Sequence, residues 1–248
     1  MTMLYLNEIE KALLAHPKKV SPDRPQAFIG GGQSKLRYIG LKAPQIRATL
    51  KNRFSFYTKS PEEITKIWDG VWHKSDCFEV LLLALAWFDD PKQSHILSSQ
   101  WSKLKSWSQR IDNWVHADLL SGIYAKILEQ NPSQTYKTMQ VWSRSQNPWL
   151  RRLSNVSLIY YSRARKKILP VTKILALVTP QLNFEDHYVQ KGVGWTLREA
   201  SNIYPKEISK FIRENIFTLS PEAFSSAIKN LPRDQKERIK HLRKTRRN

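Results

Sequence analysis

The sequence has a single cysteine among its 248 residues, Cys77, so it cannot form an internal disulfide. Apolar neighbours such as Phe78 and Val80 predict a buried, structural thiol. Long apolar runs are also missing, because Val80–Phe88 is far shorter than the roughly 20 residues that span a bilayer. The N-terminus lacks the pattern of a secretory signal. We therefore expect a cytoplasmic protein without disulfides or membrane spans.

Acidic residues are absent between Glu129 and Glu185, while the whole chain carries a formal charge of +20. A solvated helical surface normally mixes both signs of charge, which limits self-repulsion. Nine basic residues fall within this stretch: Lys137, Arg144, Arg151, Arg152, Arg163, Arg165, Lys166, Lys167 and Lys173. A one-sign stretch of this length indicates a face that meets phosphates, and hence a nucleic-acid partner.

Several catalytic signatures are missing as well. The sequence has no histidine pair at metal-ligand spacing, no Cys-x-x-Cys and no Gly-x-Ser-x-Gly, so we expect neither a metal nor a cofactor. The segment Gly30–Lys35 lacks the spacing of a phosphate-binding loop and is predicted to be a turn. Gly192 and Gly194 do not form a dinucleotide fingerprint. Inside a helix they would allow another backbone, of a helix or of DNA, to approach closely.

The apolar spacing is helical nearly throughout, and no convincing run of alternating strand residues occurs. Helix starts are marked by a capping residue followed by proline. Four examples of this pair are Ser60–Pro61, Asn131–Pro132, Asn147–Pro148 and Ser220–Pro221. The sequence therefore predicts an all-α fold.

A helical repeat is visible when the apolar segments are aligned. Their centres lie near Phe78, Trp114, Arg151, Gln190 and Phe224, at intervals of 36, 37, 39 and 34 residues. Two helices fit in each interval, which predicts an α-α superhelix whose concave, basic surface is lined by the second helix of each pair. We expect one domain over residues 1–248. Its basic C-terminal end, at about 233–248, is either a solvated helix end or an additional DNA contact.

Four residues at matching positions of successive repeats are candidates for a site. Trp114 and Asp118 are four residues apart and share one helix face. Arg152 and Trp195 occupy the next two repeats and can converge with them on the concave surface. Tryptophans are usually buried, so spacing alone slightly favours a packing role for these residues.

Several motifs in this order resemble the AlkD-like DNA alkylation repair family, whose members are HEAT-like repeat DNA glycosylases. The resemblance is strongest from about 106 to 205. Tyr38–Pro44 resembles the family's Phe-Leu-Gly-Ile-x-x-Pro segment. The other motifs are tryptophan followed four positions later by aspartate in Asn113–Asp118, Trp-Leu-x-Arg in Trp149–Arg152, and the Gln-Lys-x-x-Gly-Trp-x-Leu-Arg-Glu segment Gln190–Glu199.

The resemblance implies a monomeric enzyme of base excision repair. It would hydrolyse the N-glycosidic bond of cationic purines, such as 3-methyladenine and 7-methylguanine, in duplex DNA without enclosing a flipped base. Asp118 would oppose the cationic sugar and position water, Trp114 and Trp195 would wall the site, and Arg152 would hold a phosphate. Further DNA contacts are expected from Arg151, Lys191, Arg198, Arg163 and Lys166.

Two departures from the family pattern leave alternatives open. Val115 stands where the family commonly has aspartate, and Asp112 is a rival for the catalytic acid. A non-catalytic HEAT-like repeat protein that binds branched or damaged DNA is the main alternative function. A scaffold of the same shape that binds RNA or protein is the second.

Overall fold

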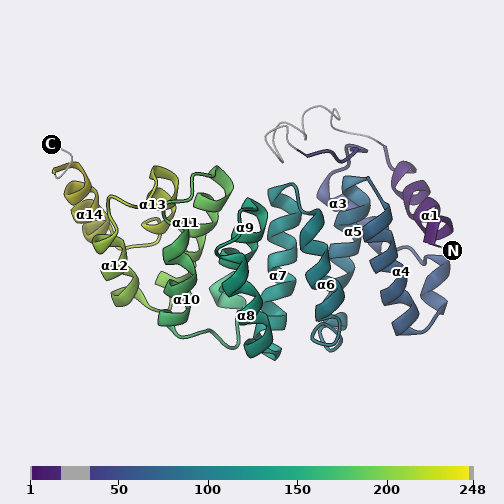
Figure 1. Cartoon of the computed structure of the whole chain (residues 1–248). Coiled ribbons are helices and arrows are strands. Elements are labelled where there is room, and N and C mark those ends of the chain that lie inside the picture. Colours follow the sequence, from purple (N-terminus) through teal and green to yellow (C-terminus); the bar gives the residue numbers. More distant parts are fainter. Residues whose placement is uncertain (1, 18–33, 246–248) are drawn as a thin grey trace. The chain divides into compact units, whose positions relative to one another are not determined.

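A computed structural model of the protein describes residues 2–17 and 34–245 (Figure 1). Of the turn predicted over Gly30–Lys35, residues 30–33 lie outside the described part of the chain. Within the described part the fold is all-α, with 13 α-helices, short 3₁₀ turns and no strand. The predicted fold class is thereby confirmed. The chain divides into two compact units, residues 1–123 and 124–248. The single domain and its concave basic surface stay predictions.

Unit 1 contains residues 1–123. Its helices are α1 (Thr2–Leu14), α3 (Ala43–Leu50), α4 (Pro61–Lys74), α5 (Phe78–Asp89) and α6 (Trp101–Trp107), with the 3₁₀ turns η1 (Ser55–Thr58), η2 (Pro91–Gln93) and η3 (Ser108–Arg110). It also includes the first part of α7 (Trp114–Gln130).

Unit 2 contains the remainder of α7 and the rest of the chain. Its helices are α8 (Pro132–Trp142), α9 (Pro148–Val156), α10 (Val171–Val178), α11 (His187–Ser201), α12 (Pro205–Glu214), α13 (Pro221–Ala227) and α14 (Arg233–Thr245), with the 3₁₀ turns η4 (Ser162–Ala164) and η5 (Thr179–Gln181). The basic C-terminal end is therefore helical as far as Thr245, and only Ile239 of α14 is buried.

Three of the four predicted caps form as expected. The Ser60 side chain accepts a hydrogen bond from the Glu63 backbone amide, and Glu63 returns the bond to complete a capping box. Asn147 and Ser220 likewise accept from backbone amides at the starts of α9 and α13. Asn131 precedes α8, but its side chain makes no capping bond; its amide nitrogen donates to the Gln134 side chain at 3.0 Å.

The predicted repeat is confirmed by the order of the helices. All five predicted centres fall on the second helix of a pair, namely on α5, α7, α9, α11 and α13. Hydrogen bonds also recur one repeat apart in the chain. In unit 1 the Trp107 indole donates to Asp69 at 2.7 Å, and in unit 2 the Tyr136 hydroxyl donates to the Lys173 carbonyl at 3.0 Å. These two bonds link α6 to α4 and α8 to α10, which are neighbouring helices in the repeat.

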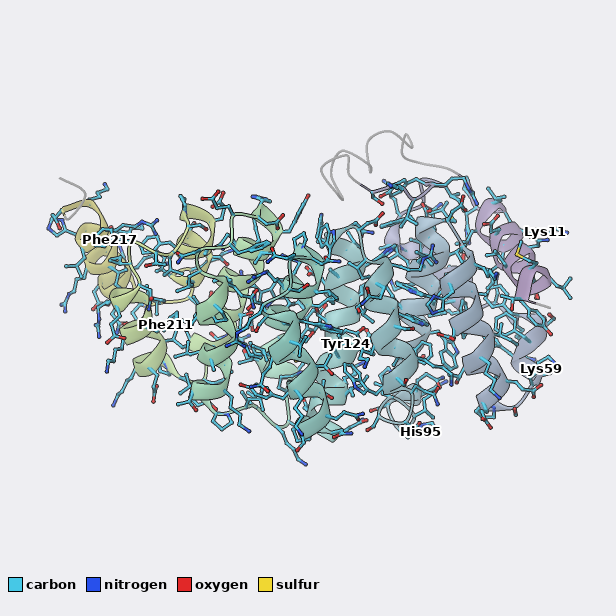
Figure 2. The ribbon with its side chains drawn as sticks, viewed as in Figure 1. Lys11, Lys59, His95, Tyr124, Phe211 and Phe217 are labelled. Atoms are coloured by element: carbon cyan, nitrogen blue, oxygen red, sulfur yellow. The ribbon has the colours of Figure 1, made fainter. Side chains whose placement is uncertain are left out.

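The two units have different cores. In unit 1 aromatic rings pack together, for example Trp72 stacked on Trp107 with centroids 4.4 Å apart. Cys77 is buried beside them, as predicted, and burial raises the pKa of its thiol to about 12. In unit 2 Phe211 is buried on α12, whereas Phe217, in the connection to α13, is 48% exposed (Figure 2).

Candidate functional site

Trp114 and Asp118 lie one turn apart on α7, in unit 1. Trp114 is half-buried, while Asp118 is only 7% exposed. Asn113 fixes the start of this helix, because its side-chain oxygen accepts a hydrogen bond from the His116 backbone amide at 2.9 Å. The packing holds the Asp118 carboxylate away from bulk water. Electrostatic interactions are stronger in such an environment than in water.

His116 anchors the same helix to the preceding repeat. Its ring is fully buried, and Nε2 lies 3.2 Å from the Phe78 carbonyl while Nδ1 lies 2.9 Å from the Asn113 amide. A neutral ring satisfies both contacts, with Nε2 donating and Nδ1 accepting. Burial lowers the pKa of His116 to about 4, although nearby Asp112 opposes the shift. His116 is thus a structural residue beside the candidate acid.

Asp112, the rival acid, has a folding role of its own. One carboxylate oxygen accepts from the Ser34 hydroxyl at 2.9 Å and from the Lys35 backbone amide at 3.0 Å. The other accepts from the Asn113 side chain at 3.0 Å. These bonds tie residues 34 and 35 to the start of α7 and account for Asp112 without any catalytic role.

Arg152 and Trp195 lie in unit 2, on α9 and α11, which pack against each other. Arg152 is buried, and its Nη1 donates to the Tyr188 carbonyl at 2.6 Å. The four predicted catalytic residues are therefore divided between the units. Convergence of the pair on α7 with the pair in unit 2 stays a prediction.

Arg151 is buried, and its side chain bonds to the protein backbone. Its guanidinium donates to the backbone carbonyls of Ser143, Ser145 and Pro180 at 2.5–3.2 Å. It also lies 4.0 Å from the centre of the Phe184 ring. A guanidinium that donates to three carbonyls inside unit 2 has a role in stabilising the fold, and a DNA contact by this residue stays a prediction.

Trp195 belongs to an aromatic cluster that the sequence reasoning did not include. Tyr160 stacks on it with centroids 5.8 Å apart, and Tyr161 meets it edge-on at 5.3 Å. The Arg198 guanidinium lies 5.4 Å from the Trp195 ring centre. The signal in the sequence was two tyrosines directly before the basic run at 163–167. We call Tyr160, Tyr161 and Trp195 the aromatic cluster.

The remaining predicted DNA contacts lie at or near the surface of unit 2. Arg163, Lys166 and Lys191 are exposed, and Arg198 is partly exposed. Arg165 instead pairs with Glu129 at 3.2 Å. These side chains are exposed to solvent, and their contact with phosphates stays a prediction.

The two glycines of the Gln190–Glu199 motif have different surroundings. A Cβ at Gly194 would lie 2.7 Å from the Ala223 carbonyl oxygen, so this glycine allows α11 to approach α13. A Cβ at Gly192 would make only ordinary contacts with Arg152 and Val156, the nearest at 3.5 Å. Of the two partners that the sequence left open for Gly194, helix or DNA, the neighbouring helix is the one observed.

Two further expectations concern metals and membranes. Among the described residues, no group of three or more His, Cys, Asp or Glu side chains could hold a metal ion. No α-helix in the described part of the chain is both long and apolar enough to cross a bilayer.

Comparisons with known proteins agree with the fold and the motifs. The profile of a family described as "DNA alkylation repair enzyme" matches residues 9–231. No curated protein matches the chain. A solved structure titled a predicted DNA alkylation repair enzyme, from Enterococcus faecalis, is similar with a TM-score of 0.65 and 16% identity, over 88% of this chain and 99% of that one.

Two structures from Streptococcus mutans are also similar. AlkD2 has a TM-score of 0.56 at 16% identity, over 93% of this chain and 99% of that one. The protein smu.31 has a TM-score of 0.51 at 18% identity, over 71% of this chain and 88% of that one. Identities this low show a shared fold, whereas the profile covers most of the chain. The resemblance seen in the motifs is confirmed, and the chain belongs to the DNA alkylation repair enzyme family.

Proposed function

We propose that the protein is a DNA glycosylase that hydrolyses the N-glycosidic bond of cationic alkylated purines in duplex DNA. The observation that carries the proposal is the buried carboxylate of Asp118, one turn from the half-buried Trp114, in a strongly basic member of an alkylation repair family. A pure DNA binder needs cations and gains nothing from an acid in a phosphate-binding surface, because the acid weakens phosphate binding.

The departure of the base needs little help from the enzyme. Alkylation at N3 or N7 makes the purine cationic, so it leaves as a neutral molecule without further protonation. The barrier lies in the deoxyribose, which becomes oxocarbenium-like as the bond stretches. Asp118 stabilises this cation and orients the attacking water, and its burial strengthens the interaction.

The other three residues support the sugar and its phosphate. Trp114 and Trp195 present electron-rich faces to the developing cation, each worth roughly 0.5 to 2 kcal/mol depending on desolvation. Arg152 holds the phosphate beside the lesion in forked geometry. Its bond to the Tyr188 carbonyl orients the guanidinium before DNA arrives.

Exposed cations of unit 2 bind the DNA backbone in this proposal. They are Lys191, Arg198, Arg163 and Lys166, which supply salt-dependent affinity. Arg151 does not belong to this set, since its guanidinium is buried on backbone carbonyls.

The test compares Asp118→Asn with the wild type on duplex DNA that contains 7-methylguanine. We expect base release to fall at least 100-fold, while affinity for the same duplex stays within a few-fold. Asp112→Asn is the matched control, and it should keep its rate of base release while losing stability. Unchanged release by Asp118→Asn would refute the proposed role.

Lesion selectivity provides a second readout of the mechanism. A neutral base lacks the positive charge that lets an alkylated purine leave as a neutral molecule. Uracil and ethenoadenine should therefore be poor substrates. Release of uracil as readily as 3-methyladenine would contradict the mechanism. Tight, salt-sensitive binding of damaged duplex without any base release by the wild type would instead establish the non-catalytic alternative.

A further inference from the structure

The turn that carries Tyr161 has an unusual backbone. Tyr161 has φ of 48°, and it is the one non-glycine residue with positive φ in the described part of the chain. L-residues with side chains are strained in this left-handed region, and such strain is concentrated at functional sites. The Tyr161 ring is also 51% exposed, so burial of the ring does not explain the conformation.

A buried carboxylate holds this turn in place. Glu199 on α11 accepts hydrogen bonds from the Ser162 backbone amide at 2.9 Å and from the Ser162 hydroxyl at 3.0 Å. The Asn202 side chain donates to the same hydroxyl at 3.0 Å. Glu199 lies one turn after Trp195 on α11, so one helix supplies both the anchor of the turn and the ring that the turn meets.

Next to the Ser162 turn held by Glu199, three aromatic rings lie together beside exposed positive charge. Tyr160 stacks on Trp195, and Tyr161 stands at 65° to the Trp195 ring. Exposed Arg163 and Lys166 follow the turn directly. Aromatic faces flanked by cations are the features with which proteins hold unstacked nucleobases and their phosphates. Stacking of this kind tolerates any base, because every base has a π-face.

We propose that the aromatic cluster of Tyr160, Tyr161 and Trp195 is a stacking site for one unstacked nucleobase of the bound DNA. Tyr161 contacts the base, and Glu199 is a positioning residue that holds Tyr161 through Ser162. This inference rests on the proposed function, in which the protein binds damaged duplex DNA. It adds an aromatic contact to a base that the lesion has disturbed from its stack. The Tyr161 ring touches Trp195 on one side and remains half exposed on the other, where a base can reach it.

The probe is a duplex with 2-aminopurine opposite a tetrahydrofuran abasic analogue, which has no base to release. Stacking on an aromatic ring quenches 2-aminopurine. Wild type and Tyr161→Phe should quench it equally, because stacking needs the ring and not the hydroxyl. Tyr161→Gly should abolish the additional quenching and weaken binding about tenfold. A fully paired 2-aminopurine duplex should show no dependence on residue 161.

Tyr161→Gly separates function from stability. Glycine adopts φ of 48° without strain, so this variant should keep the backbone of the turn while it lacks the ring, and its thermal unfolding is measured beside that of the wild type. Undiminished quenching and affinity in Tyr161→Gly would overturn the proposal. Loss of quenching in Tyr161→Phe as well would also overturn it, since the hydroxyl and not the stacking face would then be responsible.

The positioning role of Glu199 is tested by a double-variant cycle. Glu199→Ala should reduce quenching in the wild-type background but should have no effect in the Tyr161→Gly background, because the contact that Glu199 supports is already absent there. Additive losses would refute the positioning role. Asp118→Asn should quench like the wild type. The probe therefore reports on the stacking site even if Asp118→Asn keeps its base release and the proposed glycosylase function fails.

Discussion

The two units differ most clearly in charge. Unit 1 has 17 basic and 12 acidic residues, a net charge of +5, whereas unit 2 has 24 basic and 9 acidic residues, a net charge of +15. Both units are built from the same helix pairs, so the repeat itself does not require the charge. Most of the attraction to DNA is therefore expected to come from unit 2, while unit 1 contributes the candidate catalytic acid.

The cores differ in a related way. Unit 1 contains six of the nine tryptophans, and several of them pack with phenylalanines, as Trp68 does with Phe56 and Trp107 with Phe88. Unit 2 concentrates buried polar side chains on one helix, α9, where Arg151, Arg152, Ser154 and Asn155 are all buried. Asn155 and Gln181 exchange hydrogen bonds at 2.8 and 3.1 Å. Buried polar networks of this kind depend on every partner being satisfied.

Both units use a buried glutamate to hold a backbone turn. In unit 1 Glu79 accepts from the backbone amides of Ile39, Gly40 and Leu41 at 2.8–3.2 Å, at a turn where Gly40 has φ of 88°. In unit 2 Glu199 holds Ser162 after the strained Tyr161. The unit 1 turn has the glycine that its geometry favours, while the unit 2 turn retains a tyrosine. This contrast is one of the observations behind the role proposed for Tyr161.

Removal of the Glu79 carboxylate should have the largest effect on stability. Glu79→Ala leaves three backbone amides without their acceptor, and we expect a loss of about 4 kcal/mol in the free energy of unfolding. Glu199→Ala removes the acceptor of one residue and should cost about half as much. Urea denaturation measures both values. A larger loss of stability for Glu199→Ala than for Glu79→Ala would contradict this expectation.

Acid should destabilise unit 1 through His116. The pKa of His116 is about 4 in the folded protein and about 6.5 when unfolded, so the unfolded chain binds the extra proton first. Stability is therefore intact above pH 6.5 and decreases as the pH falls to 4, by about 3 kcal/mol. His116→Gln should flatten this dependence in urea titrations, whereas His187→Gln, at an exposed site of unit 2, should not.

The glycines of α11 offer a matched pair within unit 2. Gly194→Ala forces α11 away from the Ala223 carbonyl and should cost about 2 kcal/mol. Gly192→Ala meets only ordinary contacts and should be neutral or stabilising by up to about 1 kcal/mol, because alanine favours helix. Thermal unfolding compares the two. Equal losses would show that the approach of α13 is not what requires glycine.

The smallest expected effect tests the charge difference itself. Lys166→Gln with Lys167→Gln in unit 2 should weaken DNA binding by about 1 kcal/mol and reduce the slope of log affinity against log salt by about 2. The control replaces two exposed lysines of unit 1, Lys74 and Lys105. Equal effects in both units would mean that net charge does not locate the DNA contact.

The sequence by itself determined the helical class, the repeat and the helix starts. These depend on local rules, namely apolar periodicity and a capping side chain before proline, which act within one or two turns. The pairing of Trp114 with Asp118 on one face also follows from helix geometry alone. The exception is Asn131, whose side chain donates to Gln134 and does not cap α8.

Only the tertiary structure decided between residues that look alike in the sequence. Arg151 and Arg152 are adjacent, yet Arg151 donates to three carbonyls within unit 2 and Arg152 to the Tyr188 carbonyl on α11. Asp112 differs from Asp118 because Ser34 and Lys35, far away in the chain, bond to it. The role proposed for Tyr161 depends on its surroundings, because Glu199 holds the adjacent Ser162 and the Tyr161 ring meets Trp195. Such roles depend on which segments meet in space, and local periodicity carries no information about those partners.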